Sequence, residues 1–189
     1  MFLENPIKIS DELKSVIVQF WKQVKILFGV YNDKQNILLF KWLGTYIKYL
    51  IQESIFDPVK LPRFKKGHIM WVDFGYNIGS ELGGIRPAVV LEKNNSKKDK
   101  NIIIAPVRSY NSSGTTKKIE GLVYVGTNPV LSTQSYVDLK HIKSISKMRI
   151  RRARHNKINK IIIGRLSDGE LDQIDIQLSK IFQRSTDEE

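Results

Sequence analysis

Two neighbouring stretches of sequence decide the fold class: KGHIMWVDFG at residues 66–75 and GSELGGIRPAVV at residues 79–90. The first stretch contains a short apolar run at residues 69–74, and the second leads into another at residues 87–92. Both runs are rich in β-branched or aromatic residues. Short runs of this kind between turn residues predict β-strands. The residues that join the two runs are rich in glycine, so they predict an irregular loop.

The pattern of short strands continues to residue 163. Further runs lie at residues 102–107, 122–125, 136–139 and 158–163, with polar turns expected at 94–100 and 111–116. Small all-β units with such even spacing usually close into a compact barrel. A capping box of Ser167 and Glu170 then starts a helix with one apolar face, formed by Leu171, Ile174, Leu178, Ile181 and Phe182. We therefore expect residues 64–184 to form an α+β domain in which a barrel is followed by a helix.

The first sixty residues have helical periodicity instead. Ser10, followed by two acids, predicts a helix start, and apolar residues then recur three and four positions apart, at Leu13, Ile17, Phe20, Val24 and Leu27. A break is expected at Gly29 and residues 32–33, and a second amphipathic helix over residues 34–52. Two prolines within residues 57–62 predict a linker. We interpret residues 1–60 as a helical hairpin and linker that packs onto the following domain; the alternative is a membrane-surface anchor.

The composition excludes several classes of protein. The 189 residues include no cysteine, which rules out thiol nucleophiles, zinc fingers, iron–sulfur clusters and disulfide scaffolds. Hydrophobic residues make up 41% and charged residues 26%, which is typical of a globular protein. The sequence shows neither a signal peptide nor a long uncharged apolar stretch, so a cytoplasmic protein without a membrane span is expected.

The charge is unevenly distributed. The formal net charge is +12, and residues 140–165 hold ten lysines and arginines and no acid. Clustered positive charge attracts polyanions, so a nucleic-acid partner is the favoured interpretation. A solvated surface loop and a membrane-facing patch are the alternatives.

No motif for a metal or a cofactor is present. The three histidines, His68, His141 and His155, are far apart and lack ligand spacing, so no metal and no cofactor are expected. The glycine-rich segment 79–84 precedes an expected strand, whereas a phosphate-binding loop precedes a helix N-terminus.

Residues 80–86 do place three functional groups close together in sequence: the hydroxyl of Ser80, the carboxylate of Glu81 and the guanidinium of Arg86. Arg86 precedes a proline, so its backbone is held extended, and it opens an apolar strand. An arginine so placed can bind a phosphate with two donors or stabilise charge that develops on its oxygens. The alternative is a surface ion pair between Arg86 and Glu81.

These motifs resemble the PemK/MazF toxin family. The two quoted stretches look like the opening of the family's domain, and IIAPV at 103–107, KSISKMR at 143–149 and GRLSD at 164–168 follow in family order. The resemblance covers about residues 64–182. The helical first sixty residues resemble an extension carried by some relatives and lie outside the barrel.

The resemblance implies an SH3-like barrel, usually a homodimer, that acts as a metal-independent endoribonuclease. In this reaction the ribose 2′-OH attacks the adjacent phosphate, leaving a cyclic phosphate and a free 5′-OH. The implied substrate is single-stranded RNA, whose bases can be splayed out and read. The implied protein partner is a cognate antitoxin, typically with a disordered acidic tail.

The resemblance also implies roles for particular residues. Arg86 matches the catalytic arginine, and Ser80 and Glu81 match a loop that contacts RNA. The family's second catalytic position is a hydroxyl, but here it holds Arg108, followed by Ser109. Either Ser109 supplies the hydroxyl through a small register change, or Arg108 contributes a second cation.

Other departures increase the positive charge or change the proton chemistry. His141 stands where relatives often carry glutamine, so it is a candidate general base or acid; the alternative is a histidine with no role. His68 and Ser146 replace common acids. An inserted basic loop is expected to grip the RNA backbone, and the candidate RNA-binding residues of this region are Lys143, Arg149, Arg151, Arg152 and Arg154.

Two other functions remain open at this point. A barrel that has lost its nuclease activity and only binds nucleic acid or a protein, as gyrase-poisoning toxins do, would also fit the Arg108 substitution. A basic protein that binds membrane surfaces through its N-terminal helices is the third possibility.

Overall fold

The computed structural model describes residues 8–109, 120–126, 131, 133–153 and 160–183. The chain divides into two compact units, residues 1–48 and residues 49–189. Residues 49–52, the last of helix α2, belong to the second unit. The expected division into an extension of residues 1–60 and a domain of residues 64–184 stays a prediction.

The first unit contains helix α1 (Asp11–Val30) and most of helix α2 (Asp33–Gln52). Ser10 caps α1 as expected, since its side chain accepts a hydrogen bond from the backbone of Leu13. The predicted break between the helices is confirmed, since only residues 31 and 32 separate them, but Gly29 is not part of it, because α1 continues through Val30. The helix ends at Tyr31, and a reciprocal pair of hydrogen bonds between Asn32 and Gln35 starts α2.

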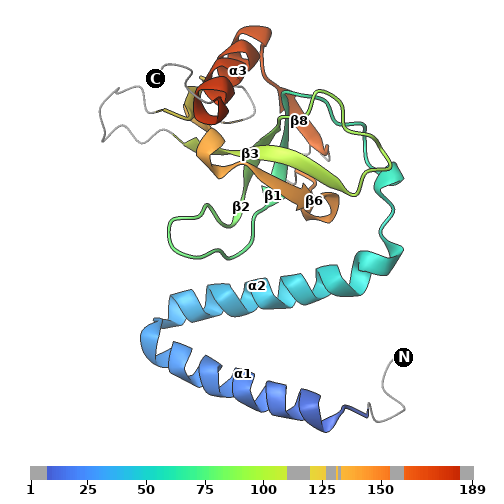
Figure 1. Cartoon of the computed structure of the whole chain (residues 1–189), viewed down its shortest axis with the longest axis vertical. Coiled ribbons are helices and arrows are strands. Elements are labelled where there is room, and N and C mark those ends of the chain that lie inside the picture. The colour runs from blue at the N-terminus through green and yellow to red at the C-terminus, as the bar shows by residue number, and fades with distance from the viewer. Residues whose placement is uncertain (1–7, 110–119, 127–130, 132, 154–159, 184–189) are drawn as a thin grey trace, which may run out of the picture. The chain divides into compact units, whose positions relative to one another are not determined.

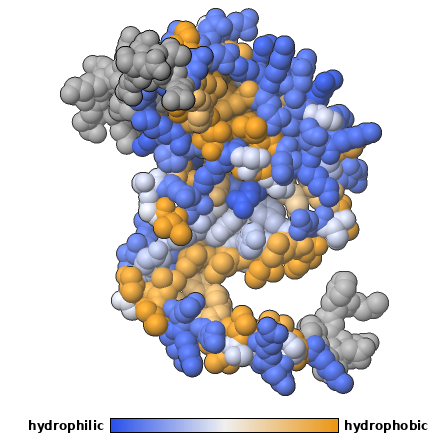
Figure 2. All heavy atoms as spheres, in the orientation of Figure 1, coloured by the Kyte–Doolittle hydropathy of each residue, from blue (hydrophilic) through white to orange (hydrophobic). Residues whose placement is uncertain are grey.

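The two helices carry many large apolar side chains. The rings of Phe28 and Phe40 pack 5.6 Å apart between the helices, and Val24 is buried. Figure 2 shows apolar residues along both helices. The expected packing of this hairpin onto the following domain stays a prediction.

The second unit is built on an antiparallel sheet (Figure 1). Its strands are β1 (His68–Asp73), β2 (Ile85–Val90), β3 (Asn101–Ser109), β4 (Leu122–Tyr124), β5 (Ser135–Asp138), β6 (Lys143–Ser146), β7 (Ile150–Arg151) and β8 (Ile162–Arg165). The order is β4-β5-β3-β2-β1-β7, with β6 also paired to β3 and β8 also paired to β1. Because β1 and β3 each have three partner strands, the sheet curves into a barrel-like shape. The predicted α+β class is therefore confirmed.

Single-turn helices and one longer helix complete this unit. The 3₁₀ helices are η1 (Glu53–Ile55), η2 (Pro58–Lys60), η3 (Leu139–His141) and η4 (Lys147–Arg149). Helix α3 (Asp168–Phe182) begins with the predicted capping box of Ser167 and Glu170. Figure 1 shows α3 at one end of the sheet, where it packs against β4 and η3.

The strand predictions fail for strands that are very short or that pair with a segment distant in the sequence. Strands β6 and β7 were not expected, because β6 is mostly polar and β7 has only two residues. They are stabilised by pairing with β3 and β1, respectively. The strand expected at 158–163 is instead β8, which begins at Ile162; residues 158 and 159 lie outside the described residues. The turn expected at 111–116 also lies outside them.

The buried side chains form two clusters, one on each face of the central strands. One cluster contains Ile69, Val89 and Ala105 and is covered by Ile174 of α3. The other contains Met70, Val72, Ala88 and Ile104, among others. Since side chains alternate between the faces of a strand, this division shows which face each polar residue at the strand ends occupies.

Candidate functional site

Arg86 lies near the start of β2 and is anchored by its own loop. It stands opposite Val72 of β1, so it shares the face of the cluster that contains Val72 and Ala88. Its Nε and Nη2 donate hydrogen bonds of 2.9 and 2.6 Å to the carbonyl oxygen of Gly83. The guanidinium is therefore held in one direction before any ligand binds.

The carbonyl that anchors Arg86 requires a glycine. A Cβ on Gly83 would lie 2.7 Å from the backbone oxygen of Gly75, closer than a side chain can approach without moving the backbone. That oxygen in turn accepts a hydrogen bond from the backbone of Gly84. The glycine-rich segment thus folds back on the end of β1 and presents its carbonyl to Arg86.

Arg108 lies near the end of β3 beside Arg86. Ala88 pairs with Pro106, and continuing this register by two residues places Arg86 opposite Arg108 on the same face. Burial, and then the charge of Arg108, lower the pKa of Arg86 from its ordinary value. The two guanidinium groups therefore interact electrostatically.

A buried carboxylate holds the second of these arginines. Asp138 ends β5 and its side chain is 3% exposed; its Oδ2 lies 3.1 Å from Nη1 of Arg108. The same Oδ2 lies 3.0 Å from Nδ1 of His141. The geometry at that nitrogen is not that of a hydrogen bond, so the two atoms make a close polar contact. Asp138 thus connects Arg108 with His141, and Arg108 interacts electrostatically with Arg86. The catalytic and RNA-binding roles expected of these residues stay predictions.

Asp138 was missed by the sequence analysis, although the sequence contained a signal. It is the only acid between Glu120 and Asp168, inside the most basic part of the chain. A lone buried acid among cations is expected to be paired.

The loop between β1 and β2 carries the other expected contacts. Ser80 and Glu81 are both exposed. Glu81 pairs with Lys143 of β6 at 2.9 Å, so the alternative ion pair between Arg86 and Glu81 is not what the structure has. Lys143 joins this loop to β6, and its charge is partly balanced by that acid.

Arg149 and Arg151 contact the end of β1. Asp73 is buried, and its Oδ2 accepts hydrogen bonds from Nη2 of Arg151 at 2.7 Å and from the hydroxyl of Tyr49 at 3.0 Å. Nη1 of Arg149 lies 3.5 and 3.4 Å from the carbonyl oxygens of Asp73 and Phe74. Burial and the charge of Asp73 raise the pKa of Tyr49.

The register separates Asp73 and Arg151 from Arg86. Arg151 stands opposite Trp71 and Asp73 follows two residues later, so both lie on the face of β1 that Val72 does not occupy. The carboxylate of Asp73 and the guanidinium of Arg86 therefore leave opposite faces of the sheet. The RNA-binding roles expected of Arg149 and Arg151 stay predictions.

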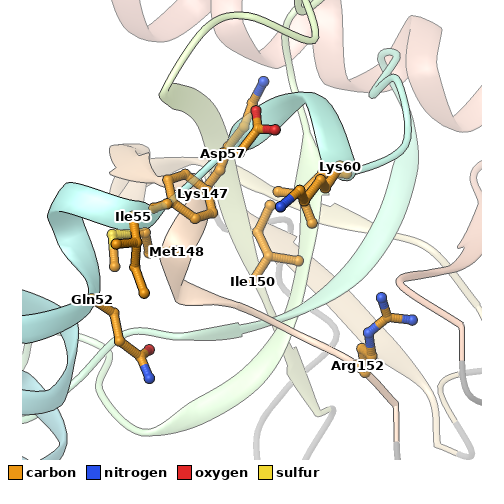
Figure 3. Close-up of a pocket in the computed structure, with 10 residues that line it drawn as sticks. Gln52, Ile55, Asp57, Lys60, Lys147, Met148, Ile150 and Arg152 are labelled. Atoms are coloured by element: carbon orange, nitrogen blue, oxygen red, sulfur yellow. The ribbon is translucent and has the colours of Figure 1, made fainter.

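Arg152 lines a cavity of ≈ 340 Å³ (Figure 3). Figure 3 shows Arg152 on one side of this cavity and Gln52, Ile55 and Met148 on the other. Lys147, also in its lining, is almost fully buried and donates a 2.7 Å hydrogen bond to the carbonyl oxygen of Ser96. Arg154 lies outside the described residues.

Comparison with known sequences identifies the family. The profile described as “PemK-like, MazF-like toxin of type II toxin-antitoxin system” matches residues 65–182, more than half of the chain. The chain belongs to this family. The resemblance read from the sequence motifs is thereby confirmed.

Solved structures of PemK/MazF toxins are among the chains that this one resembles. MazF from Deinococcus radiodurans (Form-I) is 19% identical with a TM-score of 0.47, over 64% of this chain and 96% of that chain. The Mycobacterium tuberculosis toxin MazF-mt6 is 17% identical with a TM-score of 0.44, over 61% and 95%. An endoribonuclease from a mycobacterial species, in complex with its cognate antitoxin, is 16% identical with a TM-score of 0.44, over 62% and 92%. A comparison with curated proteins finds no match.

The register of β3 bears on the two alternatives expected for Arg108 and Ser109 in this PemK/MazF-family chain. Val107, Arg108 and Ser109 pair with Val137, Tyr136 and Ser135 without a bulge. Successive side chains of a regular strand alternate, so Ser109 leaves the face opposite that of Arg108. This geometry favours Arg108 as a second cation over Ser109 as a displaced hydroxyl.

In the described part of this PemK/MazF-family chain, no group of three or more histidines and acids is placed to hold a metal ion. Over the same residues, no helix is both long and apolar enough to cross a membrane.

Proposed function

We propose that this chain is the toxin of a type II toxin–antitoxin pair and cleaves single-stranded RNA. The observation that carries the proposal is that Arg108 interacts electrostatically with Arg86 and faces the same Asp138 carboxylate as His141, in a chain of the PemK/MazF family. Two guanidinium groups bind and neutralise a phosphodiester, and an imidazole transfers protons near neutral pH.

The proposed reaction is an internal transesterification of the RNA. The 2′-OH gives up its proton to a base, and its oxygen forms a bond to the adjacent phosphorus. The bond from phosphorus to the 5′ oxygen of the next nucleotide then breaks, and that oxygen takes up a proton. The products are a 2′,3′-cyclic phosphate and a free 5′-OH, and no water is consumed.

The site residues divide these tasks. Arg86, already oriented by Gly83, stabilises the negative charge that builds on the non-bridging oxygens in the transition state. Arg108 adds a second positive charge on the same face. His141 serves as general base or acid through its Nε2 atom, because its Nδ1 faces Asp138. Ser109 remains the alternative source of a hydroxyl.

The same proposal includes the substrate and partners. Single-stranded RNA fits a site that reaches the 2′-OH and needs an unpaired backbone. Ser80, Glu81 and Lys143 would contact the RNA from the β1–β2 loop and β6, with Arg149, Arg151, Arg152 and Arg154 as further basic contacts. A cognate antitoxin with an acidic segment, a homodimeric assembly and a cytoplasmic location complete it, with residues 1–60 as an extension to a barrel domain of residues 64–184.

The direct test is digestion of single-stranded RNA by the purified protein, free of antitoxin, in EDTA. We expect cleavage at a short sequence, with cyclic phosphate and 5′-OH ends identified by end-group analysis. Arg86→Ala should abolish cleavage and keep the fold, whereas Arg63→Ala, which removes an exposed arginine ahead of β1, should cleave normally. Intact RNA after incubation with well-folded wild-type protein would overturn the proposal.

The arginine at the family's hydroxyl position favours one competing function. A barrel that binds nucleic acid or a protein without cleaving RNA would retain Arg108 as a binding residue. Analysis of total RNA and of chromosomal DNA after induction separates the two functions. Degraded RNA supports the nuclease, and intact RNA with broken DNA supports a gyrase-poison-like protein.

A further inference from the structure

The most fully paired buried acid near the proposed site is Asp138. Its Oδ1 accepts a 3.1 Å hydrogen bond from the backbone of Lys140 and so caps η3. Its Oδ2 faces both Arg108 at 3.1 Å and His141 at 3.0 Å. One carboxylate thus connects a strand end, a helical turn and two side chains from separate segments.

This arrangement has a clear electrostatic reason. A buried carboxylate without partners is strongly unfavourable, so Asp138 depends on the donors around it. Capping needs only Oδ1, and a neutral side chain can provide that acceptor. The charge of Asp138 is therefore matched to Arg108 and His141, both of which reach solvent: their side chains are 49% and 25% exposed.

We infer that Asp138 is a positioning residue for the proposed ribonuclease site. Its carboxylate anchors the guanidinium of Arg108 on the β5 side of β3 and holds His141 with Nδ1 inward. The neutral imidazole then carries its hydrogen on Nδ1, and the lone pair of Nε2 faces outward to exchange a proton with RNA. The catalytic part of this inference rests on the proposed function; the position of the ring hydrogen does not.

The geometry at Nδ1 defines what has to be measured. The distance of 3.0 Å is short enough for attraction, but the angle is not that of a hydrogen bond. If Asp138 positions the ring, then the Nδ1–H tautomer must dominate in solution.

The first measurement is long-range ¹H–¹⁵N NMR of the full-length, ¹⁵N-labelled protein at a pH where the rings are neutral. The chain has three histidines, so the signal of His141 is assigned by its loss in His141→Gln. We expect the Nδ1–H tautomer in the wild type and a shift toward the other tautomer in Asp138→Asn. The control is Asp168→Asn, which removes the same charge at an exposed position and should leave the signal unchanged.

The second measurement is RNA cleavage by the same variants. Asp138→Asn should lower kcat by roughly ten- to a hundredfold, less than the 10²–10⁴ that a general base contributes. The loss should be smaller in a His141→Gln background than in the wild type, because residues that act through one another are not additive. Asp168→Asn should cleave at the wild-type rate.

The outcomes separate this inference from the proposed function. If the wild type has His141 as the Nε2–H tautomer, the inference is overturned, and this result does not depend on the folding of Asp138→Asn. If Asp138→Asn and His141→Gln reduce kcat independently of each other, Asp138 does not act through the ring. If the wild type cleaves no RNA, the proposed function fails, and the NMR result alone decides whether Asp138 positions His141.

Discussion

Replacing Arg86 with lysine tests whether the proposed site needs the shape of the guanidinium or only its charge. The guanidinium has five N–H donors. The donors on Nε and Nη2 that reach the carbonyl oxygen of Gly83 hold the group in place, which leaves three others to face a phosphate. A lysine has one nitrogen and cannot hold Gly83 and reach the phosphate in the same geometry.

The expected magnitude follows from this division of donors. Loss of one preorganised donor to a developing oxyanion costs about 10²–10³ in kcat, or about 2.7–4 kcal/mol of transition-state stabilisation. Arg86→Lys should therefore lose at least about 10² in kcat even though it keeps the positive charge. The burial and the neighbouring charge of Arg108 that lower the pKa of Arg86 also disfavour a lysine there.

The assay is single-turnover cleavage of a labelled RNA, with circular dichroism to establish that each variant is folded. Arg63→Lys, a matched change at an exposed arginine, should cleave at the wild-type rate. An Arg86→Lys protein that cleaves as fast as the wild type would refute the reasoning, because charge alone would then be sufficient.

Three further predictions concern the supports of the site and of the barrel. Gly83→Ala should slow cleavage in the same assay while Gly29→Ala, at a position with open space, does not, because only the first Cβ meets the backbone oxygen of Gly75. Asp73→Asn should lower the free energy of unfolding by roughly 1–3 kcal/mol in urea titrations, since Arg151 and Tyr49 lose a buried acceptor; a loss no larger than that of Asp168→Asn would contradict this. Burial, with Arg165 and Lys65, lowers the pKa of His68, whose Nδ1 accepts a hydrogen bond from the backbone of Lys65. The unfolded chain therefore binds the proton more readily than the folded chain does. The free energy of unfolding should fall as the pH drops from about 6.5 through the lower folded-state pKa of His68. Urea titrations at several pH values should show a smaller fall for His68→Gln than for the wild type, and an equal fall would contradict the argument.

Much of the local structure could be predicted from the sequence. Ser10 and Ser167 cap helices because their hydroxyl groups accept hydrogen bonds from residues only three positions away. The strand that begins near Ile69 follows from a run of apolar residues with turn residues beside it. Arg86 could also be placed, because the proline after it and the glycines before it restrict its own segment of backbone.

The sequence pattern was less informative where distant segments stabilise an element. Strand β6 has little apolar character, and the ladder that it forms with β3 joins residues about forty positions apart. Gly29 did not end α1, because a single glycine costs a helix only about 1 kcal/mol and the next capping residues lie three positions later.

The order of the residues is enough to show which segments are helical, which chemical groups are available and which family the motifs match. How those groups are paired became visible only in the folded chain. Arg108 and Asp138 are thirty positions apart, and Arg151 and Asp73 are seventy-eight apart, yet each pair meets within hydrogen-bond distance. Attraction between charges depends on their distance in space, and the register of the strands sets that distance. For this reason the ten basic residues that form one block in the sequence have different partners in the folded chain. Arg149 and Arg151 contact Asp73 or its neighbour at the end of β1, whereas Lys143 pairs with Glu81 of the β1–β2 loop. Asp138 pairs instead with Arg108, which lies outside the block.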